Sequence, residues 1–281
     1  MKELIIYVHG KGGNADEAEH YKQLFTASDV IGFDYHSQNP WDAKEEFSKF
    51  VDSYSAKYDS VILVANSIGA FFCLSSLSDK QIDKAFLISP IVNMEKLICD
   101  MMLWANVNES ELAEKKEIKT DFGETLSWDY LCYVRENQIE WNVPTYMLYG
   151  EKDNLTSFET ISKFANQMNA SLTVMRNGEH WFHTDEQMEF LDNWIRQSMY
   201  GVDRQGNVAV FCSGGVGNLP EFVCENHERA YELIDYFEML EKMTSSVLMF
   251  PQSKGAEQCA RNFSDKGLYY FDANDGTKPG I

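Results

Sequence analysis

The sequence predicts an α/β protein built on a mostly parallel β-sheet. Short apolar runs, typical of strands buried on both faces of a sheet, alternate with longer segments whose apolar residues recur at helical spacing. Strands that alternate with helices in this way specify a parallel sheet covered by helices on both sides. With 281 residues and 44% hydrophobic content, the chain can bury one large core or two smaller ones.

Six strands are expected before residue 200, each marked by a short apolar run. The first, at residues 4–8, ends in a glycine-rich bend, His9-Gly10-Lys11-Gly12-Gly13. The fourth ends at a proline, which cannot donate a backbone hydrogen bond to a neighbouring strand. The five strands after the first are expected at residues 30–35, 61–64, 84–89, 144–150 and 171–175.

Helices are expected between and after these strands, where apolar residues recur every three or four positions. The last of them has an apolar face formed by Met188, Leu191, Trp194 and Ile195. Such a face is typical of a helix that packs on a core. The helices are expected at residues 15–25, 41–54, 68–77, 157–168 and 185–200.

Residues 91–142 interrupt the alternation of strands and helices. They contain no obvious strand, and apolar residues between Leu126 and Val134 recur at helical spacing. Ser127 or Thr125 is the expected cap of that helix. We therefore expect a mainly helical insertion in the sheet domain.

This insertion has a structural and a functional interpretation. As plain structure, its apolar side chains pack on the core. As a functional element, it is a lid over an active site, and Met101, Trp104 and Tyr130 line a pocket for an acyl group. The two interpretations are compatible because a lid must also pack on the core.

The composition argues against several classes of function. A net charge of −20 provides no surface that could neutralise nucleic-acid phosphates, and we interpret the acidity as a solubility feature. The first apolar run has five residues, too few for a signal peptide, and no run of 18 occurs elsewhere. We expect a cytoplasmic protein that does not interact with membranes.

Six cysteines without a C-x-x-C pair indicate neither a disulfide framework nor a zinc site.

A candidate nucleophile lies where the third strand meets the following helix, in the turn Ala65-Asn66-Ser67-Ile68-Gly69. Small residues two positions before and after Ser67 let the strand and helix approach closely. They would hold the serine in a strained backbone with its oxygen exposed at the sheet edge. An ordinary helix-capping serine is the alternative. The turn resembles the nucleophile elbow, G-x-S-x-G, of α/β-hydrolases, with Ala65 in place of the first glycine.

A candidate acid and a candidate base follow later strands. Asp153 lies three residues after the fifth strand, and His180 follows the sixth. Loops at the carboxyl ends of parallel strands carry the chemistry of such sheets. The alternatives are a turn cap for Asp153 and a surface position for His180. His183 is a second candidate base, although we prefer His180, and no third ligand nearby supports a metal site.

Residues 1 to about 200 resemble the α/β-hydrolase superfamily, and short bacterial serine hydrolases in particular. The resemblance implies a catalytic triad of Ser67, Asp153 and His180, in the chain order of that superfamily. It also implies an oxyanion hole formed by the backbone N–H groups of Ile68 and Lys11. No cofactor is expected.

The pattern changes at residue 201, and residues 201–281 are expected to form a small α+β module of unknown role. Residues 201–207 are polar and contain two glycines, a composition typical of a link between separately folded units. We therefore divide the chain into a hydrolase domain, 1–200, and a C-terminal module. Self-association through that module is left open.

These observations support two hypotheses about function. The first is a serine esterase that cleaves a carboxylic ester or thioester of a small, partly apolar substrate through an acyl-enzyme on Ser67. The second is a catalytically weak binding or interaction protein that retains the same fold. Complete candidates for the triad favour the first hypothesis, and the expected partner is a small ester-type molecule.

Overall fold

The computed structural model describes residues 2–200. By its internal contacts the chain divides into two units, Met1–Leu191 and Asp192–Ile281. The expected C-terminal module lies outside the described residues, so the boundary at residue 200 and the α+β character of 201–281 remain predictions. The first unit contains the whole expected sheet.

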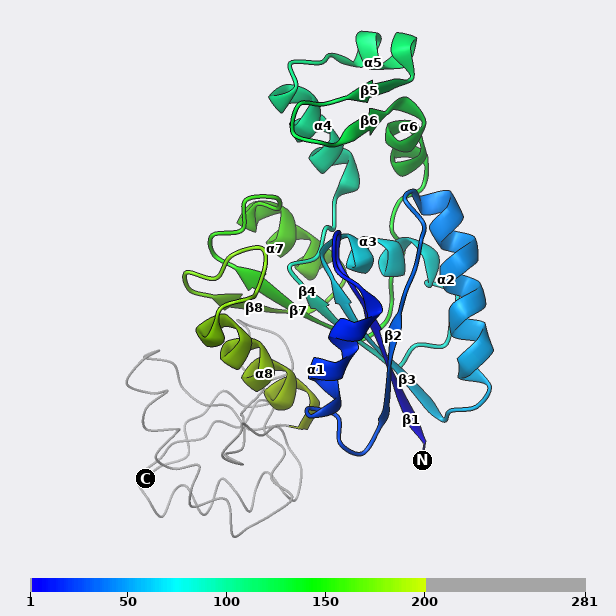
Figure 1. The fold of residues 1–281 in the computed structure, drawn as a ribbon, viewed down its shortest axis with the longest axis vertical. Coiled ribbons are helices and arrows are strands. Elements are labelled where there is room, and N and C mark those ends of the chain that lie inside the picture. The colour runs from blue at the N-terminus through cyan, green and yellow to red at the C-terminus, as the bar shows by residue number, and fades with distance from the viewer. Residues whose placement is uncertain (1, 201–281) are drawn as a thin grey trace, which may run out of the picture. The chain divides into compact units, whose positions relative to one another are not determined.

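A six-stranded, fully parallel sheet forms the centre of the first unit (Figure 1). All six expected strands are present, and their ends lie within two residues of the predicted positions. The spatial order is β2-β1-β3-β4-β7-β8. The strands are β1 (Glu3–Val8), β2 (Asp29–Phe33), β3 (Ser60–Asn66), β4 (Lys84–Ile88), β7 (Thr145–Gly150) and β8 (Ser171–Met175).

The first strand shows why its apolar run is continuous. Leu4, Ile6 and Val8 point to one face of the sheet and belong to the main core cluster. Tyr7 points to the other face and stacks on Tyr21 with ring centroids 4.8 Å apart. Both faces are therefore covered, as in parallel sheets generally, and alternation between polar and apolar residues is lost.

The expected helices are present, with one change. Residues 15–25 form a 3₁₀ turn followed by a short α-helix that ends at Lys22, and the turn begins at an Asn14–Glu17 capping box. No helix among the described residues is long and apolar enough to cross a membrane. The elements are η1 (Ala15–Glu17), α1 (Ala18–Lys22), α2 (Pro40–Ser55), α3 (Ser67–Ser76), α7 (Phe158–Gln167) and α8 (Asp185–Tyr200).

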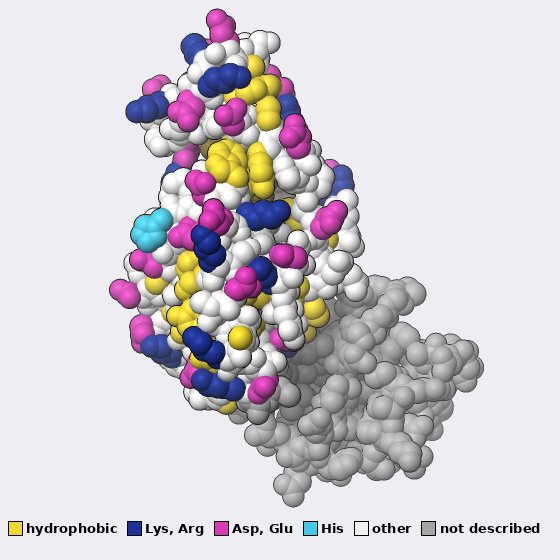
Figure 2. Space-filling model, turned by 90° about the vertical axis from the view of Figure 1, so that its right-hand side faces the viewer, with side chains coloured by type: hydrophobic (Ala, Val, Ile, Leu, Met, Phe, Trp, Pro, Cys, Tyr) yellow, Lys and Arg dark blue, Asp and Glu magenta, His cyan; other side chains and the backbone are white. Residues whose placement is uncertain are grey.

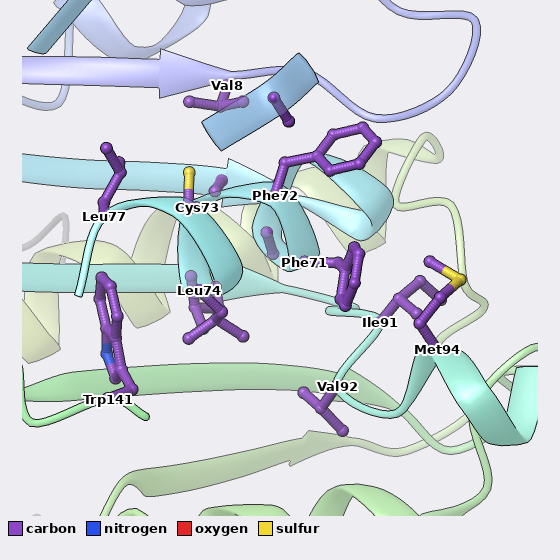
Figure 3. Packing of buried hydrophobic residues seen from close by; sticks show 14 of the residues in the cluster. Val8, Phe71, Phe72, Cys73, Leu74, Leu77, Ile91, Val92, Met94 and Trp141 are labelled. Atoms are coloured by element: carbon purple, nitrogen blue, oxygen red, sulfur yellow. The ribbon is translucent and has the colours of Figure 1, made fainter. Parts of the chain in front are cut away.

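Helix α3 is buried almost completely, and α2 packs beside it (Figure 1). Figure 3 shows Phe71, Phe72 and Leu74 of α3 among side chains from β1 and from the segments around Val92 and Trp141. A helix that is apolar on all sides must be surrounded by protein. The segment after β3 is therefore held rigidly at the centre of the core.

The insertion lies beyond the sheet edge at which the parallel strands end (Figure 1). The prediction that it contains no strand is wrong, because β5 and β6 pair as a short antiparallel hairpin. Each strand has three residues, too few to show a period of two, and Gly123 at φ +86° forms part of the turn. The elements are α4 (Met94–Trp104), α5 (Glu109–Lys115), β5 (Glu117–Lys119), β6 (Thr125–Ser127) and α6 (Trp128–Glu136).

Of the two caps considered for α6, the structure selects Ser127. Its hydroxyl accepts a hydrogen bond from the backbone N–H of Tyr130 at 3.3 Å. Thr125 instead lies at the start of β6. Asn93 and Asn108 cap α4 and α5 in the same way, which gives each insertion helix a defined first turn.

The first turn of α3 packs so closely on the end of β1 that Gly69 has no space for a side chain. A β-carbon at this position would lie 2.3 Å from the carbonyl oxygen of His9. We expect Gly69→Ala to lower the free energy of unfolding by about 1–3 kcal/mol, as overpacking in a core does, and chemical denaturation would measure this loss.

Gly13→Ala is the comparison, because the atoms nearest to a β-carbon there belong to the carboxylate end of the Glu17 side chain and not to the backbone, so a smaller loss is expected. Equal losses of stability in the two variants would contradict the close packing at Gly69.

Candidate active site

Ser67 occupies a strained position at the junction of β3 and α3. Its φ of +51° lies in the left-handed region, which is unfavourable for a residue with a β-carbon. Such a conformation costs about 1–3 kcal/mol and persists only where the surrounding structure imposes it. Asn66 takes the helix-cap position and Ser67 begins the helix, so Ser67 is not an ordinary capping serine.

The loop after β1 lies directly against this elbow. A β-carbon on Gly10 would lie 3.2 Å from the β-carbon of Ser67. The backbone N–H of Gly13 donates to the carbonyl of Gly10 at 3.1 Å, and Gly12 adopts φ +78° within this turn. The glycine-rich bend therefore lets the backbone approach the serine closely.

The structure brings Ser67, His180 and Asp153 together in one line of contacts. Ser67 Oγ lies 2.8 Å from His180 Nε2, and His180 Nδ1 lies 2.7 Å from Asp153 Oδ2. The imidazole is 15% exposed and the carboxylate is fully buried. A carboxylate at Nδ1 keeps the proton on that nitrogen, so Nε2 is free to accept the serine proton.

The Asp153 carboxylate is oriented by its own turn. Its Oδ1 accepts hydrogen bonds from the backbone N–H groups of Leu155 at 2.8 Å and Thr156 at 2.9 Å. The other oxygen is left for the imidazole. Next to it, burial and, secondarily, the Asp153 charge raise the pKa of Tyr149, whose hydroxyl donates to the Thr156 carbonyl at 2.9 Å. Tyr149 therefore supports the turn as a neutral donor.

The loops after β7 and β8 carry the candidate acid, Asp153, and the candidate base, His180, and they contact each other directly. A β-carbon on Gly150 would lie 2.4 Å from the carbonyl oxygen of Glu179, so these loops touch through their backbones. The backbone N–H of Lys152 donates to the Gly178 carbonyl at 2.7 Å. Because β7 and β8 are parallel neighbours, Asp153 and His180 emerge at the same sheet edge.

His183, the second candidate base, makes different contacts. Its Nδ1 lies 2.7 Å from the carbonyl oxygen of Trp181, and its ring stacks on the Trp181 indole. Glu179 lies 3.7 Å away. The sequence alone left the choice between the histidines open, and the structure places His180, not His183, beside Ser67.

A cavity of about 770 Å³ opens beside Ser67. All five residues predicted for the oxyanion hole and the acyl pocket contribute to its walls: Lys11, Ile68, Met101, Trp104 and Tyr130. Residues of the insertion and of the β3–α3 junction thus line one cavity. The role of the Ile68 and Lys11 N–H groups as oxyanion donors remains a prediction.

Several wall residues were not predicted from the sequence. Phe122 and Glu124 come from the β5–β6 turn, and Phe122 meets Trp104 edge-to-face with ring centroids 6.1 Å apart. Tyr35 follows β2, stacks on His9 at 4.4 Å and donates to the His9 carbonyl at 3.1 Å. The only available signal was the position of Tyr35 at the end of an expected strand.

Two buried polar atoms belong to wall residues and have no hydrogen-bond partner among the described residues. They are Tyr130 Oη and His9 Nε2. Burial, and secondarily the nearby Tyr35, raises the pKa of Tyr130, so its hydroxyl stays neutral. Both atoms are buried behind the cavity wall and retain unused hydrogen-bonding capacity.

No protein-family model and no curated protein matches this chain. Solved structures do match. Est1E from Butyrivibrio proteoclasticus gives a TM-score of 0.57 at 15% identity, over 70% of this chain and 87% of that one. A putative hydrolase from Agrobacterium vitis S4 gives a TM-score of 0.58 at 20% identity, over 69% of this chain and 87% of that one.

The mouse α/β hydrolase domain-containing protein 10 gives a TM-score of 0.56 at 15% identity, over 67% of this chain and 86% of that one. These similarities and the parallel sheet define the class: the chain has the α/β-hydrolase fold. The α/β-hydrolase fold predicted for residues 1 to about 200 is thereby confirmed. Sequence identities of 15–20% establish the fold alone.

The geometry predicts which of the two histidines activates Ser67. His180→Gln should lower the rate of Ser67 labelling by a fluorophosphonate probe about 10³-fold or more, as the loss of a triad base does. His183→Gln should change that rate much less, because His183 contacts Trp181 and not the serine. Mass spectrometry of the labelled peptide would measure both, and the reverse ranking would contradict the assignment.

Proposed function

We propose that this protein is a serine hydrolase that cleaves a carboxylic ester or thioester of a small, partly apolar molecule. The supporting observation is the line of contacts from Ser67 through His180 to Asp153, at 2.8 Å and 2.7 Å, with the serine in a strained backbone. Three groups of the right chemistry within hydrogen-bonding distance meet the geometric requirement for nucleophilic catalysis by serine.

In the proposed reaction, Ser67 Oγ attacks the carbonyl carbon of the substrate as His180 Nε2 accepts its proton. The Asp153 carboxylate stabilises the resulting imidazolium. The negative charge on the carbonyl oxygen is held by the backbone N–H groups of Ile68 and Lys11. His180 then transfers its proton to the departing alkoxide or thiolate, which leaves an ester between the acyl group and Ser67.

Water completes the cycle. His180 accepts a proton from a water molecule as its oxygen attacks the acyl carbon, and the same proton returns to Ser67 Oγ as the acyl–oxygen bond breaks. The products are a carboxylic acid and the regenerated serine.

The cavity supports a partly apolar substrate. Met101, Trp104 and Tyr130, all from the insertion, contribute largely apolar walls. Two of the similar solved structures are Est1E and Est1E with bound ferulic acid, the second with a TM-score of 0.55 at 16% identity. An aromatic acid of that kind is a reasonable acyl group to include in a substrate series.

The alternative function is a binding protein with the same fold and weak or no catalysis. It would also use the cavity beneath the insertion. A binder has no need for a serine at φ +51° whose hydroxyl lies 2.8 Å from an imidazole. That strain favours the hydrolase.

Removal of the nucleophile tests the proposal. Ser67→Ala should abolish fluorophosphonate labelling and turnover of nitrophenyl esters, while the melting temperature stays the same or rises, because strain at a functional residue is relieved.

Ser89→Ala is a matched control. Ser89 is a buried serine at the end of β4 with φ +43°, and its Oγ has no partner among the described residues. Labelling that persists in Ser67→Ala, or disappears equally in Ser89→Ala, would reject the mechanism.

The size and lining of the cavity predict a preference for longer acyl chains. Each buried methylene contributes about 0.8 kcal/mol, so kcat/KM should rise about four-fold per carbon from nitrophenyl acetate until the pocket is filled. Trp104→Ala should reduce this gradient because it removes apolar wall. A kcat/KM that is flat or falls from acetate to hexanoate would show that the acyl group does not enter the cavity.

A further inference from the structure

We propose that the active site selects uncharged substrates, and that Glu124 determines this selectivity by neutralising Lys11 at the wall of the cavity. The inference rests on the proposed function and narrows it to neutral esters and thioesters. It follows from the charges of the described wall residues, which the mechanism does not use.

Among the described residues that line the cavity, the acidic and basic side chains are Lys11 and Glu124. These two form an ion pair between Lys11 Nζ and Glu124 Oε1. One comes from the loop after β1 and the other from the β5–β6 turn, 113 residues later in the chain. The Lys11 ammonium group at the cavity wall is therefore already paired with a carboxylate of the insertion.

His9 is the remaining basic group on the wall. It is buried, and its Nδ1 lies 2.8 Å from the carbonyl oxygen of Gly10, which places a proton on that nitrogen. Its Nε2 is buried and has no hydrogen-bond partner among the described residues. Because Nε2 is buried and Nδ1 faces a carbonyl oxygen, His9 presents no exposed donor to an entering anion.

An anionic substrate would gain little at such a wall. A carboxylate or phosphate that enters must lose hydration, and it needs a cation or several N–H donors in return. Here the Lys11 charge is balanced by Glu124. The apolar insertion residues Met101 and Trp104 offer surface for an uncharged group instead.

The charge of the protein as a whole also disfavours an anionic substrate. The chain carries a net charge of −20, so an approaching anion meets a repulsive potential. Figure 2 shows a face of the described part on which acidic and basic side chains are interspersed around hydrophobic ones, without a continuous basic patch on that face. A neutral ester does not experience this electrostatic repulsion.

The test compares two esters that differ by one carboxylate. These are p-nitrophenyl hexanoate and the p-nitrophenyl monoester of adipic acid, which places a carboxylate at the end of a six-carbon acyl chain. We expect the wild-type protein to prefer the neutral ester at least about ten-fold in kcat/KM at low salt, with a smaller preference at about 150 mM salt.

Glu124→Gln should lower this ratio about two- to five-fold, because it leaves Lys11 as an unpaired cation at the cavity wall. Glu111→Gln is the matched control. It removes one negative charge from another exposed ion pair, that with Lys115 on α5, which does not line the cavity. Its ratio should equal the wild-type ratio.

Equal turnover of both esters by the wild-type protein would overturn the inference and leave the proposed function intact. Equal shifts in Glu124→Gln and Glu111→Gln would also overturn it, because net charge and not the Lys11 pair would then set the preference. Absence of turnover with both esters, together with no labelling of Ser67, would reject the proposed function and this inference with it.

Discussion

The close approach of the end of β1 to the first turn of α3 is the constraint on which the candidate site depends. Gly69 lies against the His9 carbonyl, and Gly10 lies against Ser67. This contact is possible because β1 and β3 are parallel neighbours, with Val8 opposite Ala65. The serine with positive φ and the loop that carries Lys11 therefore lie together at this contact.

The other half of the site is built by loops and not by the sheet alone. Ser67 follows β3, whereas Asp153 and His180 follow β7 and β8, with β4 between the two groups. The loops must therefore reach across one strand. Contact between the backbones of Gly150 and Glu179 fixes the two loops against each other, so the imidazole has a defined position over the serine.

Most of the sheet was predictable from the sequence because parallel strands buried on both faces form continuous apolar runs. The triad candidates followed from their positions at strand ends. The β5–β6 hairpin was missed because strands of three residues carry no visible period. The Lys11–Glu124 pair joins residues 113 positions apart across an unpredicted turn. Contacts of that kind depend on tertiary structure, and no local pattern encodes them.

The neutralised cation at the cavity wall has a consequence for the end of the proposed catalytic cycle. Hydrolysis of an uncharged ester releases a carboxylic acid that is already ionised at neutral pH, so the product carries a charge that the substrate lacked. The wall that admits the ester has Lys11 already paired with Glu124 and, among the described residues that line it, offers that anion no unpaired lysine or arginine. The protein's net charge of −20 then favours its departure. Product release would be assisted by electrostatics, and accumulated carboxylate would inhibit the enzyme only weakly.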